Sequence, residues 1–162
     1  MGGYLTCESQ LGKGTTFNVH VSFTAVETKT VHKETNKEAL RGMRVLVAED
    51  NKVNQMIMKE LLSSVGVEVT MADNGIKALE LLHTNTFDVV LMDIQMPEMD
   101  GLTATAQIRL DYRFANLPVL AMTANVGTEH LAESMAAGMN EHLTKPVDVD
   151  KLYSALKTWG KR

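Results

Sequence analysis

The chain has 162 residues, 44% of them hydrophobic, which fits one ordinary domain with some additional chain and excludes wholesale disorder. Its formal net charge of −4 argues against nucleic acid as a partner, because phosphate binding needs a basic surface. The single cysteine excludes an intrachain disulfide. The sequence has no long apolar run and no signal-peptide pattern, so we expect a cytoplasmic domain that makes no direct membrane contact.

The first predicted element is a β-hairpin within residues 1–25. A short strand at Tyr4–Cys7 and a second strand at Thr16–Phe23 flank a glycine-bearing turn at Gln10–Gly14. Alternation in the second strand gathers its apolar side chains on one face: Phe17, Val19, Val21 and Phe23. Because an isolated hairpin is marginally stable in water, we expect this face to pack against the rest of the chain or another chain, which makes the hairpin a candidate for association.

Residues 26–42 are rich in Thr, Lys, Glu and Asn and are predicted to form a linker. In residues 43–162, apolar runs typical of buried strands alternate with segments of helical periodicity. Strands are predicted at Val45–Ala48, Val67–Met71, Val89–Met92, Pro118–Met122 and Glu141–Thr144. Helices are predicted at Asn51–Val65, around Ala78–Leu82, and at Leu102–Leu110, Thr128–Ala137 and Val149–Leu156.

This alternation predicts an α/β fold, a doubly wound five-stranded parallel sheet with helices on both faces. Ligands of such sheets bind at the carboxyl ends of the strands. Five chemically active residues follow those ends: Glu49, Asp50, Asp93, Thr123 and Lys145. Three clustered carboxylates repel one another, so we expect the lysine to offset one charge and a divalent cation, Mg²⁺ by its preference for oxygen, to offset two. A carboxylate held this way is a plausible nucleophile toward phosphorus.

Four segments carry a family resemblance: Ala48–Asn51, Met92–Gly101, Met122–Asn125 and Leu143–Pro146. In order and spacing they resemble the receiver domain of two-component response regulators, over about Met43–Trp159. The resemblance implies the flavodoxin-like strand order 2-1-3-4-5.

The same resemblance implies that Asp93 accepts a phosphoryl group from a phosphohistidine donor. It assigns Mg²⁺ to Glu49, Asp50, Asp93 and the backbone carbonyl of Gln95. It assigns the switch hydroxyl to Thr123, the phosphoryl-binding amine to Lys145, a cis peptide to Lys145–Pro146, and control of the phosphoryl lifetime to Gln95 and Asn125.

Two positions depart from the family pattern. Glu49 stands where Asp is frequent, and His142 stands where an aromatic residue usually reports the movement of the switch threonine. Imidazole is smaller than the usual aromatic ring and titrates near neutral pH, so a switch that uses His142 would be altered. The alternative is that His142 is an ordinary surface histidine.

The segment Gly2–Phe17 resembles the C-terminal end of the ATP-binding domain of sensor histidine kinases. A hairpin remnant at 1–25, a linker at 26–42 and a receiver at 43–162 follow the order of a hybrid histidine kinase. The nucleotide-binding boxes of such a kinase are absent from this chain, so we expect no ATP binding. The parent protein would be the kinase, which leaves open an inner-membrane anchor outside this sequence.

The predicted function is therefore phosphorelay, with a histidine kinase or a histidine phosphotransfer protein as partner and a monomeric receiver. Met56 and Met58, on the first helix of the receiver, are either core residues or part of the docking surface. One alternative function is a Mg²⁺-dependent phosphatase of the haloacid dehalogenase type, although Gln95 stands where that class needs a second Asp. The other is a receiver-like binding module that is not phosphorylated.

Overall fold

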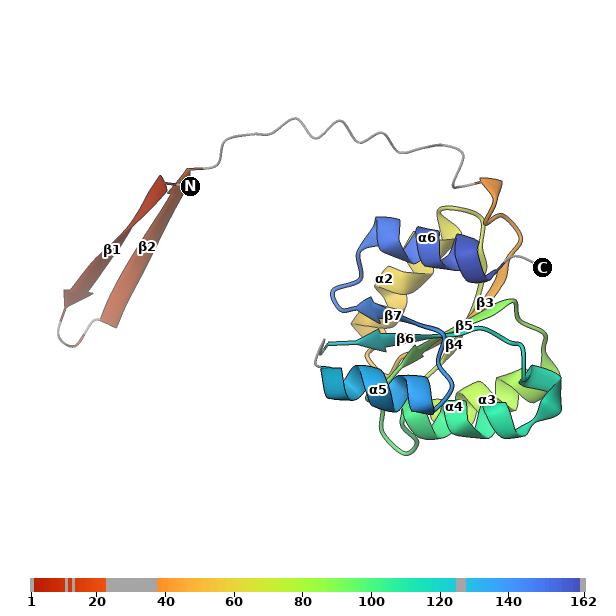
Figure 1. Ribbon diagram of the computed structural model, residues 1–162. Coiled ribbons are helices and arrows are strands. Elements are labelled where there is room, and N and C mark those ends of the chain that lie inside the picture. Colours follow the sequence, from red (N-terminus) through yellow and green to blue (C-terminus); the bar gives the residue numbers. More distant parts are fainter. Residues whose placement is uncertain (1, 11, 13, 23–37, 125–127, 161–162) are drawn as a thin grey trace. The chain divides into compact units, whose positions relative to one another are not determined.

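The computed structural model describes residues 2–10, 12, 14–22, 38–124 and 128–160. The chain divides into two compact units, Met1–His32 and Lys33–Arg162 (Figure 1). In the first unit, β1 (Gly2–Gln10) and β2 (Gly14–Ser22) form an antiparallel hairpin.

The predicted apolar face of the hairpin is open where its side chains are described. Phe17 and Val19, two residues apart on β2, are 63% and 67% exposed. Phe17 lies opposite Cys7 in the strand pairing. The Val21 side chain and Phe23 lie outside the described residues. The covering of this face by other chain segments therefore stays a prediction.

The second unit is built on a parallel sheet with the order β4-β3-β5-β6-β7. Its strands are β3 (Arg44–Ala48), β4 (Glu68–Ala72), β5 (Val89–Asp93), β6 (Val119–Thr123) and β7 (Glu141–Thr144). Counted from β3, this is the predicted order 2-1-3-4-5, so the doubly wound five-stranded parallel sheet is confirmed. The described helices are α2 (Lys52–Ser63), α3 (Gly75–Thr84), α4 (Gly101–Leu110), the 3-10 helix η1 (Tyr112–Phe114), α5 (Thr128–Ala136) and α6 (Val149–Trp159).

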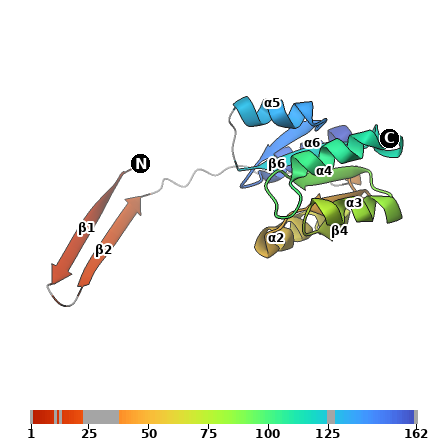
Figure 2. The same cartoon turned by 90° about the horizontal axis from the view of Figure 1, so that it is seen from below.

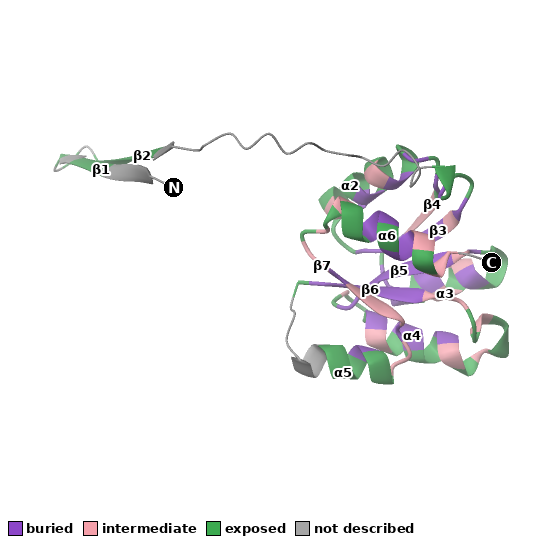
Figure 3. Ribbon diagram, turned by 45° about the horizontal axis from the view of Figure 1, so that its top comes forward, coloured by how far each residue is buried: buried purple, intermediate pink, exposed green. Residues whose placement is uncertain are grey.

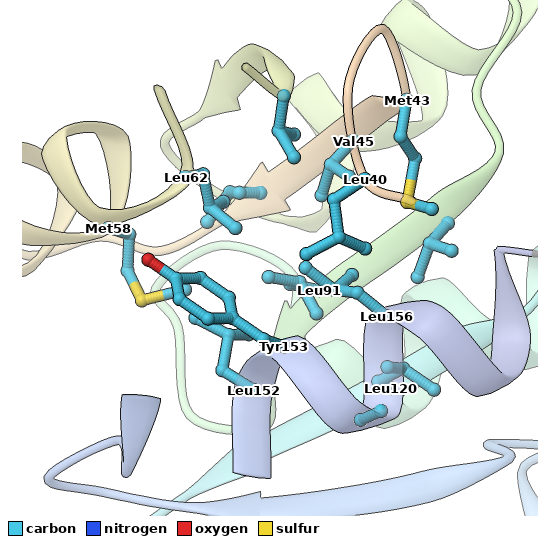
Figure 4. Close-up of a cluster of buried hydrophobic side chains, with 14 of the residues drawn as sticks. Leu40, Met43, Val45, Met58, Leu62, Leu91, Leu120, Leu152, Tyr153 and Leu156 are labelled. Atoms are coloured by element: carbon cyan, nitrogen blue, oxygen red, sulfur yellow. The ribbon is translucent and has the colours of Figure 1, made fainter. Parts of the chain in front are cut away.

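Helices α2 and α6 cover one face of this sheet, and α3, α4 and α5 cover the other (Figures 1 and 2). Alternate strand residues point into two apolar layers because side chains alternate between faces along a strand. Figure 4 shows the layer under α2 and α6, formed by residues that include Leu40, Met43, Val45, Met58, Leu62, Leu91, Leu120, Leu152, Tyr153 and Leu156. Leu40, from the predicted linker segment, is fully buried in this layer. Among the described helices, none is long and apolar enough to cross a membrane.

The central strands are buried along their whole length, as Figure 3 shows in purple for β5 and β6. Burial on both faces explains why their sequences are continuous apolar runs rather than alternating ones. The sheet therefore holds the residues at the ends of these strands on a rigid support.

The side of α2 that carries Val53 and Ile57 does not face the sheet. Val53 and Ile57 have helical spacing, yet they are 65% and 52% exposed. The buried stripe is Gln55, Met58 and Leu62, which Val65 continues into the core. Two apolar stripes run along this helix, and only packing against the sheet selects between them. Met58 is therefore a core residue, whereas Met56 is exposed and stays a candidate for the docking surface.

Arg109 of α4 joins two connections at the amino edge of the sheet, the one between α4 and β6 and the one between α5 and β7. Its guanidinium donates to the carbonyl oxygens of Gly138, Phe114 and Leu117 at 2.9, 3.0 and 2.9 Å. It also donates to Asn140 Oδ1 at 3.0 Å. Burial lowers the pKa of Arg109 from its ordinary value, yet the group stays charged because a guanidinium does not lose its proton in proteins.

We expect Arg109→Met to lower the free energy of unfolding by about 2–3 kcal/mol, because several partly buried acceptors lose their donor. Denaturant unfolding followed by the fluorescence of Trp159, the single tryptophan, measures the change. The matched control is Arg113→Met, since Arg113 pairs with Asp111 at the surface and should matter little. Equal losses in both variants would contradict a specific role for Arg109.

Candidate functional site

Strand β5 delivers Asp93 to the carboxyl edge of the sheet. Its backbone pairs with β3 on one side and β6 on the other, with Asp93 opposite Met122. Helix α4 begins against this strand end, where the Gly101 amide donates to Ile94 O at 3.0 Å. A Cβ atom at Gly101 would overlap the carbonyl oxygen of Asp93, so only glycine permits this approach. The position of Asp93 is therefore set by backbone packing on both sides.

Three carboxylates meet at this edge. One oxygen from each of Glu49, Asp50 and Asp93 lies within 4.8 Å of the others. The side chains of Glu49 and Asp93 are 1% and 7% exposed, whereas Asp50 is exposed to solvent. A cleft of about 670 Å³, lined in part by Asp50 and Gln95, opens beside the cluster. The site thus combines two buried carboxylates with one that faces an entrance.

Lys145 joins the two buried carboxylates. Its Nζ lies 2.5 Å from Glu49 Oε2 and 2.5 Å from Asp93 Oδ2. Burial raises the pKa of Asp93 above its ordinary value, and the hydrogen bond and charge of Lys145 offset only part of that effect. Burial would lower the pKa of Lys145, but its bonds to the two carboxylates outweigh it and raise that pKa. The lysine is therefore a fixed positive charge at neutral pH.

The donor set fits Mg²⁺. Three carboxylates and one ammonium leave a formal charge of −2, which one divalent cation balances. All the donors are oxygen atoms, as Mg²⁺ prefers, and the exposed side leaves room for the waters that it retains. The Gln95 amide donates to Asp93 Oδ1 at 3.2 Å. The assignment of the Gln95 carbonyl as a ligand stays a prediction.

Thr123 ends β6 beside Asp93 and is buried, with 8% of its surface exposed. Its carbonyl oxygen accepts a hydrogen bond from the Lys145 amide at 2.7 Å. The Lys145–Pro146 peptide bond that follows is cis. Asn125, predicted to control the phosphoryl lifetime, lies outside the described residues.

His142 is half-buried and tied to helix α5, so the description as an ordinary surface histidine does not fit. Its Nε2 shares a hydrogen bond with the Oγ of Ser134, a fully buried residue. His142 lies opposite Ala121 on β6, two residues before Thr123, and therefore on the same face of the sheet as the threonine. The side chain links β7 to α5 on the face where Thr123 lies.

Burial lowers the pKa of His142 below its ordinary 6.5. The unfolded chain therefore binds a proton before the native state does, and this residue should reduce stability as the pH falls through 6.5 toward the lower native value. Urea unfolding across that range should show a weaker pH dependence in His142→Gln than in the wild type. The control is His83→Gln, at an exposed position on α3. NMR titration that placed the His142 pKa at or above 6.5 would contradict the prediction.

Two residues that sequence reasoning missed hold Glu49 from helix α2. Asn54 Nδ2 donates to Glu49 Oε1 at 2.9 Å, and Gln55 Nε2 donates to the Glu49 carbonyl oxygen at 2.5 Å. Gln55 also donates to Asp73 Oδ1 at 2.7 Å, and Lys52 pairs with the same carboxylate. A polar residue at position 55 on the buried stripe of a helix is the sequence signal that could have pointed to this contact.

Comparison with known proteins places the whole site within one family. A family model described as the response regulator receiver domain matches residues 45–157. Histidine kinase 5 of Arabidopsis thaliana is 33% identical over 184 aligned positions, covering 98% of this chain and 19% of that protein. The aerobic respiration control sensor protein ArcB of Escherichia coli K12 is 36% identical over 160 positions, covering 97% of this chain and 20% of that protein. The chain thus spans about a fifth of the length of these curated relatives.

A solved structure shows the same fold. The receiver domain of sensor histidine kinase PA1611 from Pseudomonas aeruginosa PAO1 is 35% identical and superposes with a TM-score of 0.70. The match covers 74% of this chain and 98% of that one. That structure is described with a magnesium ion coordinated in its active site cleft.

Proposed function

The chain belongs to the response regulator receiver domain family, and we propose that its Asp93 accepts a phosphoryl group from a phosphohistidine in a Mg²⁺-dependent phosphorelay. One observation carries the proposal: a buried aspartate at a strand end shares a lysine with Glu49, and one oxygen from each of Glu49, Asp50 and Asp93 lies within 4.8 Å of the others. Glu49, Asp50, Asp93 and the Gln95 carbonyl would hold the metal. When bound, Mg²⁺ supplies positive charge to the phosphoryl oxygens.

In the proposed transfer, an oxygen of ionised Asp93 attacks the phosphorus atom while the bond from phosphorus to the donor imidazole breaks. The electron pair of that bond returns to the imidazole nitrogen, and the aspartyl phosphate forms. Lys145, already at Asp93 Oδ2, favours the ionised carboxylate against the effect of burial and is placed to meet a phosphoryl oxygen. The Thr123 hydroxyl is the proposed donor to a second phosphoryl oxygen.

The proposed readout runs through β6, β7 and α5. Phosphorylation replaces the single negative charge of the Asp93 carboxylate with a phosphoryl group that carries nearly two, and this group would draw Thr123 and Lys145 toward the site. His142, on the Thr123 face and hydrogen-bonded to Ser134, would pass that movement to α5. A hydrogen-bonded imidazole would thus take the place of a freely rotating aromatic ring.

The proposed partner is a histidine phosphotransfer protein or a histidine kinase, which would bind a monomeric receiver. Val53, Met56 and Ile57 expose apolar surface on α2, the helix that follows Asp50. An adjoining groove of about 410 Å³ is lined by residues that include Ile57, Lys145 and Pro146. A partner seated there would bring its imidazole close to Asp93.

We further propose that the chain is part of a cytoplasmic hybrid histidine kinase region. Histidine kinase 5 and the sensor protein ArcB, reported above, match the chain along almost its whole length. The hairpin at 1–25 would end the ATP-binding domain, and residues 26–42 would link it to the receiver at 43–162. The exposed Phe17 and Val19 would then pack against the preceding kinase segment.

The test is to incubate the chain with Mg²⁺ and acetyl phosphate and to follow its intact mass. A gain of one phosphoryl group that requires Mg²⁺ supports the proposal. Steady release of phosphate from small phosphate esters, without an adduct, would favour a phosphatase instead. If the chain formed no phosphoryl adduct and bound no Mg²⁺, the result would favour a binding module and contradict the phosphorelay proposal.

A further inference from the structure

The carboxylate of Glu49 is held on both of its oxygens. Oε1 accepts from Asn54 Nδ2 at 2.9 Å and from the Asn51 amide at 3.3 Å, while Oε2 accepts from Lys145 at 2.5 Å. The side chain is 1% exposed, so water cannot replace these donors easily. A buried charge of this kind is stable only when it keeps its hydrogen bonds.

The first turn of α2 supplies most of this support. Asn54 holds the carboxylate, and Gln55, the next residue, holds the Glu49 carbonyl oxygen at 2.5 Å. The turn is itself fixed by the Asn51 cap, whose Oδ1 accepts from the Val53 amide at 2.9 Å. Both ends of Glu49 are thus anchored to one rigid element.

A glutamate needs this anchoring more than an aspartate would, because its side chain has one more rotatable bond. Lys145 pulls Oε2 toward Asp93, and the Asn51 amide at 3.3 Å is a weak restraint on Oε1. The Asn54 amide opposes that pull. It also adds no positive charge, whereas a cationic donor at this position would repel a divalent ion.

We infer that Asn54 is a positioning residue that sets the Mg²⁺ affinity of the site by fixing the Glu49 carboxylate. The inference rests on the proposed function, since it concerns the same metal site. Partners that orient metal-binding side chains typically change affinity by about 10–100-fold when they are removed.

The test is isothermal titration of Mg²⁺ into the whole chain, without any phosphodonor, in a double-mutant cycle. Asn54→Leu should weaken binding by about tenfold. In the Glu49→Asp background the carboxylate is too short to reach Asn54, so adding Asn54→Leu should change binding by less than about twofold. Asn54→Ser, which cannot reach Glu49 but stays polar, should behave like Asn54→Leu and repeats the test if the leucine variant does not fold.

Two further measurements separate positioning from general structure. The matched control Asn116→Leu, on the exposed loop that precedes β6, should bind Mg²⁺ like the wild type. In metal-free wild type, the Asn54 side-chain amide proton should resonate downfield because of its charged acceptor, and Glu49→Gln should remove that shift. The inference would be overturned if Asn54→Leu bound Mg²⁺ as tightly as the wild type. It would also be overturned if Asn54→Leu lowered the Mg²⁺ affinity equally in the wild-type and Glu49→Asp backgrounds. Either result would leave the proposed metal site intact. No Mg²⁺ binding by the wild type would overturn the proposed metal site and the inference together.

Discussion

Asp93→Asn should abolish phosphorylation of the chain by acetyl phosphate in the presence of Mg²⁺. The amide of asparagine cannot attack phosphorus. Glu49 and Asp50 should not replace Asp93 as acceptors, because only Asp93 ends β5, the strand that pairs with both β3 and β6. Intact mass spectrometry should show the phosphoryl adduct in the wild type and not in the variant.

The matched control for this variant is Asp100→Asn. Asp100 caps α4, where its Oδ1 accepts from the Thr103 amide at 2.7 Å, and asparagine caps a helix equally well. The control should therefore still be phosphorylated. An adduct that persists at wild-type level in Asp93→Asn would mean that another residue is the acceptor.

The same Asp93 variant should be more stable than the wild type in metal-free buffer at neutral pH. Burial raises the pKa of Asp93, so ionising it costs the native state stability as the pH rises from 3.8 through that raised value. Asparagine carries no charge to bury, and Lys145 keeps Glu49 as a partner. At saturating Mg²⁺ the wild type should instead be the more stable protein, because only the wild type has all three carboxylates and should bind the ion more tightly.

Lys145→Met should lower the free energy of unfolding by about 3 kcal/mol at neutral pH without metal, the largest effect on stability that we expect. Glu49 and Asp93 would lose the cation that they share, and two neighbouring buried carboxylates would repel each other. Urea unfolding followed by Trp159 fluorescence measures the loss.

The pH and metal dependence identify the cause of that loss. Without the lysine the pKa of Asp93 should rise further. The loss in free energy of unfolding caused by Lys145→Met should therefore shrink as the pH falls toward the ordinary aspartate value of 3.8. Mg²⁺ should restore part of the stability by replacing the missing charge. The control is Lys52→Met, which removes an exposed pair with Asp73. A Lys145→Met protein as stable as the wild type at neutral pH would show that the buried pair is unimportant.

The fold was predictable from the sequence because each strand and each helix carries its own local signal. The run at Val89–Met92 is apolar on both faces, and only a strand covered on both sides needs such a run. Strands separated by helices leave few topologies, and the observed sheet order is the predicted one. The η1 turn at Tyr112–Phe114 was not predicted, because three residues are too few to show periodicity.

The packing of α2 could not be read from its sequence. Val53 and Ile57 have the spacing of a core stripe and are exposed, while Gln55 lies on the buried side. Periodicity identifies a helix but does not say which of two apolar stripes meets the sheet. That choice depends on the direction in which the chain leaves β3, which the Asn51 cap and the bonds to Glu49 establish.

By itself, then, the sequence determined that Glu49, Asp50, Asp93, Thr123 and Lys145 lie at one edge of a parallel sheet, because strand ends in this topology must coincide there. Only the tertiary structure decided how they are held: one lysine shared by two buried carboxylates, Asn54 on the Glu49 oxygen, and His142 bonded to Ser134. These contacts join side chains from different elements. Their distances depend on how each helix packs on the sheet, which no local pattern of residues encodes.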